Sequence, residues 1–241
     1  MKLNNINLFK PISLEEMDAV SLMKRTDTKF VVHINQLGQI LEMVKDYYQI
    51  LEINSQRLMS YNSSYFDTKN LTFYNDHHKQ RKVRAKVRVR EYLETDVKFI
   101  EIKQKSNKGQ TNKTRIKTED PKDLEGTNAF AKQILNQSED LQLSMSNSFN
   151  RFTLVSNELM ERVTIDTNIQ FNEKLWNENL VIIELKQEKL RRSSPLFKAL
   201  KTLHLHPASI SKYCLGMSSI YNHLKTNNFK PVFRNINKII A

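Results

Sequence analysis

Nine consecutive residues, 82–90, alternate strictly between basic and apolar side chains and read Lys-Val-Arg-Ala-Lys-Val-Arg-Val-Arg. Successive side chains of a β-strand point to opposite faces, so this period of two predicts a strand with all its charges on one face. Like charges held this close repel each other unless they meet bulk water or an anionic ligand. Two interpretations follow: a solvated edge strand, or a strand that faces a strongly anionic ligand.

The positive charge of the whole chain is concentrated around this strand. The chain has 241 residues and a formal net charge of +12. Fourteen of its Lys and Arg residues lie between Lys79 and Lys117, against four acidic residues, so this stretch alone carries +10. Such a field attracts polyanions, among them nucleic acid, anionic lipid, nucleotides and polyphosphate.

Composition also bears on the compartment. The single cysteine, Cys214, excludes an internal disulfide framework and fits a reducing compartment. No apolar run reaches 18 residues, and the first residues lack the apolar core of a signal peptide. We therefore expect a cytoplasmic protein without a transmembrane segment, which is compatible with a membrane-protein partner.

Residue periodicity predicts eight strands, at 25–33, 57–67, 81–93, 97–105, 112–119, 147–156, 159–168 and 180–188. It predicts helices at 13–23, 34–48, 71–78 and 127–137, one from Ser194 and one from Ser211 to about Lys225. Ser13 and Glu16 have the spacing of a capping box. We expect one domain over 1–241, with a core of about 25–225 and an unassigned tail after Asn227. Short connections favour antiparallel pairing, and eight antiparallel strands can close into a barrel.

Most of the predicted strands carry charge on one face. The residues that share these faces are Arg25, Asp27 and Lys29; Glu101, Lys103 and Lys105; Lys113, Arg115 and Lys117; and Glu184 and Lys186. Arg151 and Arg162 lie on the two arms of the late hairpin. We therefore expect a β-rich α+β fold: an eight-stranded antiparallel barrel forming a tunnel with a charged, mainly basic lumen, and helices over its apolar outside. The alternative is a half-buried sheet whose charges face water.

Four segments resemble the VTC domain, the catalytic domain of vacuolar transporter chaperone-type polyphosphate polymerases, in the triphosphate tunnel metalloenzyme superfamily. They are Arg25-Thr-Asp-Thr-Lys29-Phe; Ser64-Tyr-Phe-Asp67-Thr with Leu71 and Tyr74; Lys86-Val-Arg88-Val-Arg90-Glu-Tyr92 with Glu101-Ile-Lys103 and Lys113-Thr-Arg115; and Asn150-Arg151, Arg162-Val-Thr-Ile-Asp166, Glu184-Leu-Lys186 and Ser211-Lys212. Their order and spacing, over about residues 25–216, make the resemblance more specific than any one segment does.

The resemblance implies an enzyme that transfers the terminal phosphate of ATP to a growing inorganic polyphosphate chain with a divalent metal, Mn²⁺ or Mg²⁺. It implies that the phosphate-binding residues are Lys29, Arg88, Arg90, Lys103, Lys113, Arg151, Arg162 and Lys212, with Glu184 as the metal ligand. Lys86, Arg115, Lys186 and Ser211 are predicted to be cofactor-binding residues.

Three other functions fit the same residues. A triphosphatase of this fold would hydrolyse tripolyphosphate or a nucleoside triphosphate with a nearly identical site. A nucleic-acid-binding module would place aromatic side chains on the basic surface, but here Val and Ala separate the charges and face away, which argues against sequence-specific binding. A non-catalytic polyphosphate sensor would bind without turnover.

Overall fold

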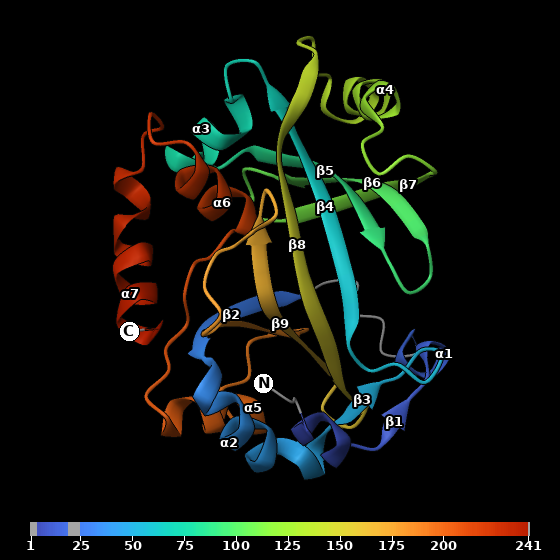
Figure 1. The fold of residues 1–241 in the computed structure, drawn as a ribbon, viewed down its shortest axis with the longest axis vertical. Helices are drawn as coiled ribbons and strands as arrows, with labels where there is room; N and C mark the ends of the chain where they lie inside the picture. The colour runs from blue at the N-terminus through green and yellow to red at the C-terminus, as the bar shows by residue number, and fades with distance from the viewer. Residues whose placement is uncertain (1–3, 19–24, 241) are drawn as a thin grey trace.

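The computed structural model describes residues 4–18 and 25–240. Figure 1 shows a strongly curled sheet with helices around its outside. The strands are β1 (Pro11–Ile12), β2 (Thr26–His33), β3 (Gln49–Leu51), β4 (Met59–Thr68), β5 (Arg84–Tyr92), β6 (Val97–Lys105), β7 (Thr111–Thr118), β8 (Leu141–Ser156), β9 (Glu161–Phe171), β10 (Lys174–Leu175) and β11 (Leu180–Gln187). The helices are η1 (Asn4–Leu8), α1 (Leu14–Asp18), α2 (Ile34–Val44), η2 (Lys45–Tyr47), α3 (Thr72–His78), α4 (Leu124–Leu135), α5 (Pro195–Thr202), α6 (Lys212–Ile220), η3 (Asn227–Phe229) and α7 (Lys230–Ile240).

The eight predicted strands are present and form one continuous path. They pair in the order β2-β11-β9-β8-β4-β5-β6-β7, and all neighbours on this path are antiparallel. β8 extends six residues beyond the predicted start at 147 and reaches both halves of the sheet. Bulges at Tyr65/Phe66 and Ser148/Asn150 interrupt its register with β4 and β9. Bulges increase local bend and twist, which curls the sheet.

The prediction of a closed barrel is wrong, because β2 and β7 remain edges and no ladder joins them within 4–18 and 25–240. The edge of β2 is bonded instead by the segment that leads into α6. The Ala208 N–H donates to the Lys29 carbonyl at 2.8 Å, and Phe30 forms an isolated bridge with Pro207. This segment takes backbone groups that closure would need. It also carries the following residues, Ile210 to Lys212, to the concave face.

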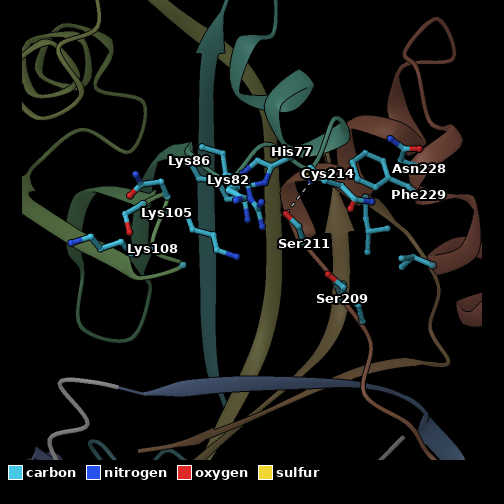
Figure 2. A pocket seen from close by; sticks show the side chains of 18 residues that line it. His77, Lys82, Lys86, Lys105, Lys108, Ser209, Ser211, Cys214, Asn228 and Phe229 are labelled. Carbon is cyan, nitrogen blue, oxygen red and sulfur yellow. Dashed lines mark hydrogen bonds between the residues drawn. The ribbon is translucent and has the colours of Figure 1, made fainter. Parts of the chain in front are cut away.

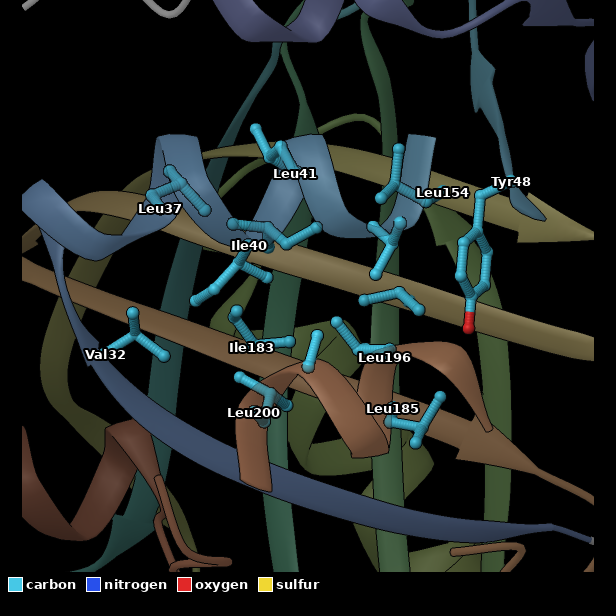
Figure 3. Packing of buried hydrophobic residues seen from close by; sticks show 14 of the residues in the cluster. Val32, Leu37, Ile40, Leu41, Tyr48, Leu154, Ile183, Leu185, Leu196 and Leu200 are labelled. Atoms are coloured by element: carbon cyan, nitrogen blue, oxygen red, sulfur yellow. The ribbon is translucent and has the colours of Figure 1, made fainter. Parts of the chain in front are cut away.

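The apolar faces of the strands point outward and are covered by helices. On β5 and β6, Ala85, Val87 and Val89 pack with Ile100 and Ile102 beneath α4. Figure 3 shows α2 and α5 packed over the other half of the sheet, where buried residues from both helices meet those of β2, β8 and β11. The strict alternation at 84–90 therefore has the predicted consequence. The apolar side chains pack into the core, and the basic side chains lie on the concave face of the sheet.

The observed helices differ from the predicted helices mainly at their ends, and they differ more than the strands do. The capping box at Ser13 is confirmed, because the Glu16 N–H donates to its hydroxyl at 3.2 Å and its own N–H donates to Glu16 at 2.9 Å. Residues 19–23 of that predicted helix lie outside the described residues. The helix from Ser211 ends at Ile220 instead of Lys225, and the unassigned tail forms η3 and α7. None of the helices in the described part of the chain is long and apolar enough to cross a membrane.

A cation-lined cavity as the candidate active site

A cavity of about 650 Å³ occupies the concave face of the curled sheet. All eight strands of the main path contribute side chains to it, together with α1 and the start of α6. Every site residue predicted from the sequence lines this cavity: Lys29, Lys86, Arg88, Arg90, Lys103, Lys113, Arg115, Arg151, Arg162, Glu184, Lys186, Ser211 and Lys212. The sheet thus gathers residues from 29 to 212 around one space.

Strand register places three lysines in a row across the sheet. Lys86 on β5 lies opposite Lys103 on β6, and Lys103 lies opposite Lys113 on β7. Side chains directly opposite on antiparallel strands stand about 5 Å apart at Cβ, and like charges there are destabilising. Within the described residues, no carboxylate lies within ion-pair distance of Lys86 or Lys103. An anion between these ammonium groups would relieve their repulsion.

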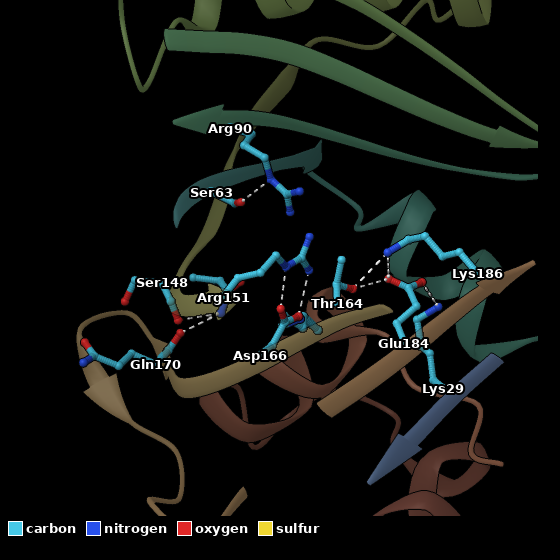
Figure 4. A network of polar contacts seen from close by, with 12 residues as sticks. Lys29, Ser63, Arg90, Ser148, Arg151, Thr164, Asp166, Gln170, Glu184 and Lys186 are labelled. Atoms are coloured by element: carbon cyan, nitrogen blue, oxygen red, sulfur yellow. Dashed lines mark hydrogen bonds and ion pairs between the residues drawn. The ribbon is translucent and has the colours of Figure 1, made fainter. Parts of the chain in front are cut away.

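Glu184 and Asp27 are the two carboxylates that line the cavity within the described residues, and Asp27 is paired with Arg25 at 3.1 Å while Glu184 lies among lysines. Glu184 lies between Lys29, at 2.5 Å, and Lys186, at 3.2 Å, and its side chain is 16% exposed. Figure 4 shows both ammonium groups on this carboxylate. Burial alone would raise the pKa of Glu184, but the charges of Lys186 and Lys29 outweigh burial and hold that pKa well below its usual range. The group is therefore an ionised, hard oxygen donor that faces the cavity.

Two further carboxylates lie behind the cations and do not line the cavity. Glu101 accepts from Arg88 at 2.5 Å and from Lys113, while Asp166 accepts from Arg151 at 2.5 Å and from Lys212. Both are almost fully buried. Burial raises the pKa values of both carboxyl groups. The neighbouring cations lower these pKa values by a larger amount, so both groups stay ionised. Each of these two carboxylates holds two cations in place. In the sequence, Glu101 lies on a predicted charged face, and Glu101 and Asp166 both lie in segments that resemble the family, but neither is predicted to have this role.

One stacked pair of aromatic rings contacts both Arg90 and Arg151. Tyr61 and Phe149 are stacked with centroids 5.2 Å apart, and the Arg90 guanidinium lies 5.6 Å from the Tyr61 centroid and 5.7 Å from that of Phe149. Arg151 lies 5.2 and 5.1 Å from the same two centroids. Cation–π contact orients a guanidinium without neutralising it. The sequence pattern does not indicate this pair of rings, although Tyr61 shares a face with Tyr65 in a period-two strand.

Burial, together with the nearby cations, lowers the pKa values of several lysines in the cavity. Burial lowers the pKa of Lys113 to about 8 and that of Lys186 to about 8, even though each touches a carboxylate. Burial, followed by the charge of Arg88, lowers the pKa of Lys103 well below its ordinary value. A bound anion would favour the charged forms of these lysines.

The start of α6 is held in place by a buried aspartate. Asp67 accepts from the Phe73 and Tyr74 N–H groups, both at 2.9 Å, and from the Tyr213 hydroxyl. The Tyr213 ring in turn stacks on Tyr65 at 5.1 Å. Asp67 therefore joins the first turn of α3 to α6 and fixes the helix whose first residue, Lys212, enters the cavity.

A divalent cation fits this site only in part. No group of three or more His, Cys, Asp or Glu side chains within 4–18 and 25–240 could hold a metal by itself. Glu184 offers one ionised carboxylate at the cavity surface, and Mg²⁺ is commonly bound by one or two carboxylates together with substrate phosphates. The residues present therefore fit a metal that enters with a phosphate ligand.

An antiparallel sheet curled around a cation-lined cavity places this protein in the fold class of the triphosphate tunnel proteins. Solved structures of this shape include a proposed adenylate cyclase from Bacillus halodurans, with 14% identity, a TM-score of 0.55, and coverage of 78% of this chain and 96% of that chain. A proposed adenylate cyclase from Vibrio parahaemolyticus has 13% identity, a TM-score of 0.51, and coverage of 80% and 97%. At such identities the likeness concerns the fold alone.

A third solved structure is a proposed adenylyl cyclase from Hippeastrum, reported to have a dominant triphosphatase activity; it has 12% identity, a TM-score of 0.50, and coverage of 82% and 96%. A search of curated proteins gave no match. The sequence matches the VTC domain over residues 24–221, so the chain belongs to the VTC domain family. The resemblance noted from the sequence is thereby confirmed.

Proposed function

We propose that the protein is a metal-dependent phosphotransferase that moves the terminal phosphate of ATP onto a growing inorganic polyphosphate chain. The observation that carries this proposal is the row of Lys86, Lys103 and Lys113 beside Arg90, in a cavity with far more cations than carboxylates. Such a row matches a linear chain of phosphates better than a single phosphate. Membership of the VTC domain family supports the same substrate class.

In the proposed reaction, a terminal oxygen of polyphosphate bonds to the γ-phosphorus of ATP while the bond from that phosphorus to the β–γ bridging oxygen breaks, and ADP leaves. Phosphoryl transfer depends on positioning and charge stabilisation, which preorganised cations supply. Lys86 and Lys103 would hold phosphate oxygens, and Arg90 would stabilise charge on the transferred group. Glu101 and Asp166 would keep their cations oriented throughout.

A divalent metal, Mn²⁺ or Mg²⁺, would be held by Glu184 and phosphate oxygens, and it would neutralise charge on the phosphates. Lys29 and Lys186 already contact this carboxylate. They would therefore share its oxygens with a metal, since an ionised carboxylate offers about four lone-pair sites and the two lysines occupy one on each oxygen.

Triphosphate hydrolysis is the alternative that the comparisons favour, because a protein of the same fold is reported to have a dominant triphosphatase activity. It differs only in the acceptor, since water would then attack the phosphorus. Incubating purified protein with ATP and Mn²⁺, then sizing the phosphate products by gel electrophoresis, separates the two. We expect a ladder of long chains that EDTA abolishes; free phosphate alone would identify a triphosphatase, and no product would contradict both.

Binding of phosphate rather than bases gives a second test. We expect tripolyphosphate to compete for the cavity more strongly than single-stranded DNA of equal charge, because the lining presents cations and their supporting rings are already packed. A higher affinity for the DNA would instead support a nucleic-acid-binding function.

A further inference from the structure

A second cavity, of about 770 Å³, adjoins the first. Lys86, Ile210 and Ser211 line both. Figure 2 shows lysines of β5, β6 and the β6–β7 loop on one side of this second cavity and Phe229 and Asn228 on the other, with Ser211 between them. The two spaces are therefore neighbours that meet at the start of α6.

Positive charge runs without interruption from the first cavity into the second. Arg90, Arg88 and Lys86 are followed on the same face of β5 by Arg84, which lines the second cavity, as does Lys82 just before the strand. Residues two apart on a strand are about 6.7 Å apart, so these cations form a regular track. Lys105 and Lys108 lie across from its end.

The second cavity differs from the first in its charge balance. Within the described residues, no Asp or Glu lines it, although five Lys or Arg residues do. The buried Ser106 hydroxyl, also in its lining, has no hydrogen-bond partner among the described residues. The N-terminus of α6, capped by Ser211, points its partial positive charge to the junction of the two spaces. All three features favour an anion with more than one charge.

The wall opposite the lysines comes from residues 228–232, which lie beyond the region matched to the VTC domain, 24–221. Phe229 packs against Tyr74 and His78 with centroids 5.9 and 5.3 Å apart. Both contacts are edge-to-face and hold the ring against α3. Among the described residues the cavity lining presents five Lys or Arg side chains and a single Phe, Tyr or Trp ring, which favours an inorganic chain over a nucleic acid.

We propose that the second cavity binds inorganic polyphosphate beyond the three phosphates that the first cavity holds, so that one chain passes Lys86 and extends along Lys82, Lys105 and Lys108. This proposal rests on the proposed function for its substrate class only, since it concerns binding and not transfer. It predicts that long chains bind more tightly than tripolyphosphate, and that the additional affinity depends on these three lysines.

The test compares Lys82→Gln/Lys105→Gln/Lys108→Gln with Lys122→Gln/Lys189→Gln/Lys198→Gln. The control removes equal charge from exposed lysines that line neither cavity. Binding of tripolyphosphate and of polyphosphate of about 50 phosphates is measured by calorimetry without ATP. Solvated charge contacts are each worth two- to threefold, so we expect about a tenfold loss of long-chain affinity in the first variant. Tripolyphosphate affinity should stay within twofold in both variants.

Equal loss for both ligands would overturn the proposal, because the lysines would then act on the triphosphate site. Unchanged long-chain affinity, an equal loss in the control variant, or stronger binding of a uridine homopolymer than of polyphosphate would also overturn it. None of these outcomes depends on whether the wild-type protein elongates, hydrolyses or merely binds. Failure of this proposal and failure of the proposed transferase activity are therefore distinguishable.

Discussion

The two sides of the candidate active site handle positive charge in different ways. On β2 and β11, Lys29 and Lys186 share the carboxylate of Glu184. On β5 and β6, Lys86 and Lys103 face each other, and no carboxylate of the described residues is within ion-pair distance of either. Arg88 is the exception on that side, since it is paired with Glu101.

This difference defines two groups of cations: those paired with a carboxylate, which support the structure of the site, and those without a carboxylate partner, which are available to bind an anionic ligand. A buried charge pair is costly to break, because removing one partner leaves the other without compensation. Unpaired neighbouring cations repel each other, so their presence is a cost to folding that an anionic ligand offsets. We therefore expect substitutions of paired residues to alter stability or chemistry, and substitutions of unpaired cations to alter affinity.

Glu184→Gln should have the largest effect on turnover. It keeps the side-chain shape but removes the negative charge of the carboxylate assigned to the metal, and metal stabilisation of phosphate charge is worth several kcal/mol. Metal-dependent turnover should fall roughly 10³-fold. Tripolyphosphate affinity should hold or increase, because Lys29 and Lys186 are released. Glu188→Gln, just past the end of β11, is the control, and near-normal turnover of Glu184→Gln would refute the metal assignment.

Arg151→Met should have the largest effect on stability. It leaves Asp166 buried with only Lys212, and breaking a buried pair costs about 3 kcal/mol. Arg81→Met is the matched control, because it removes an arginine whose pair with Asp76 lies at the surface and should cost less than about 1 kcal/mol. Urea unfolding measures both, and equal losses would show that the buried pairs do not build the site.

Lys103→Met should reduce tripolyphosphate affinity about tenfold, the value of one charge-assisted contact. Its free energy of unfolding should be unchanged or higher, because repulsion by Lys86 is removed. Lys122→Met, at an exposed position just before α4, should change neither property. Destabilisation of Lys103→Met without loss of affinity would remove the distinction between the two sides.

Raising the pH should have the smallest effect, in opposite directions for folding and binding. The pKa values of Lys113 and Lys186 are about 8 in the folded protein and near 10.5 in the unfolded chain. Between about pH 8 and 10.5 the unfolded chain binds more protons, so these lysines make the free energy of unfolding rise with pH. Triphosphate favours the charged lysines, so its affinity should fall severalfold over the same interval. Calorimetry of triphosphate binding at pH 8.5, in two buffers with different ionisation enthalpies, should detect proton uptake on binding. A triphosphate affinity that does not depend on pH would contradict the assignment of these lysines to the triphosphate site.

Local patterns were sufficient to predict the eight strands of the main path, because alternation such as that along 84–90 needs only the pleat of a single strand. The short strands β1, β3 and β10 were not predicted. Local patterns also indicated that the charged faces would meet, since one charged face per strand gathers on one concave side, while the roles of the individual residues remain predictions from the family resemblance. Barrel closure could not be predicted in this way. It depended on whether the edge of β2 would pair with β7 or with the distant residues 207–208, which carry no strand pattern.

The supporting residues of the site were hidden for a similar reason. Glu101 and Asp166 look like ordinary members of charged strands, and only the register shows that each lies between two cations. Tyr61 and Phe149 come from β4 and β8, and their stacking depends on a pairing across 88 residues of chain. Asp67 likewise acts on Tyr213, far along the chain, through a hydrogen bond that no local spacing indicates.

A crystal structure of the protein with tripolyphosphate and Mn²⁺ tests the central claim most directly. We predict phosphate oxygens within hydrogen-bond distance of Lys86, Arg90 and Lys103, with the metal on Glu184. This result would show that the unpaired cations of β5 and β6 form the triphosphate-binding site. Tripolyphosphate bound outside the first cavity, or bound there only through the paired lysines Lys29 and Lys186, would contradict the account.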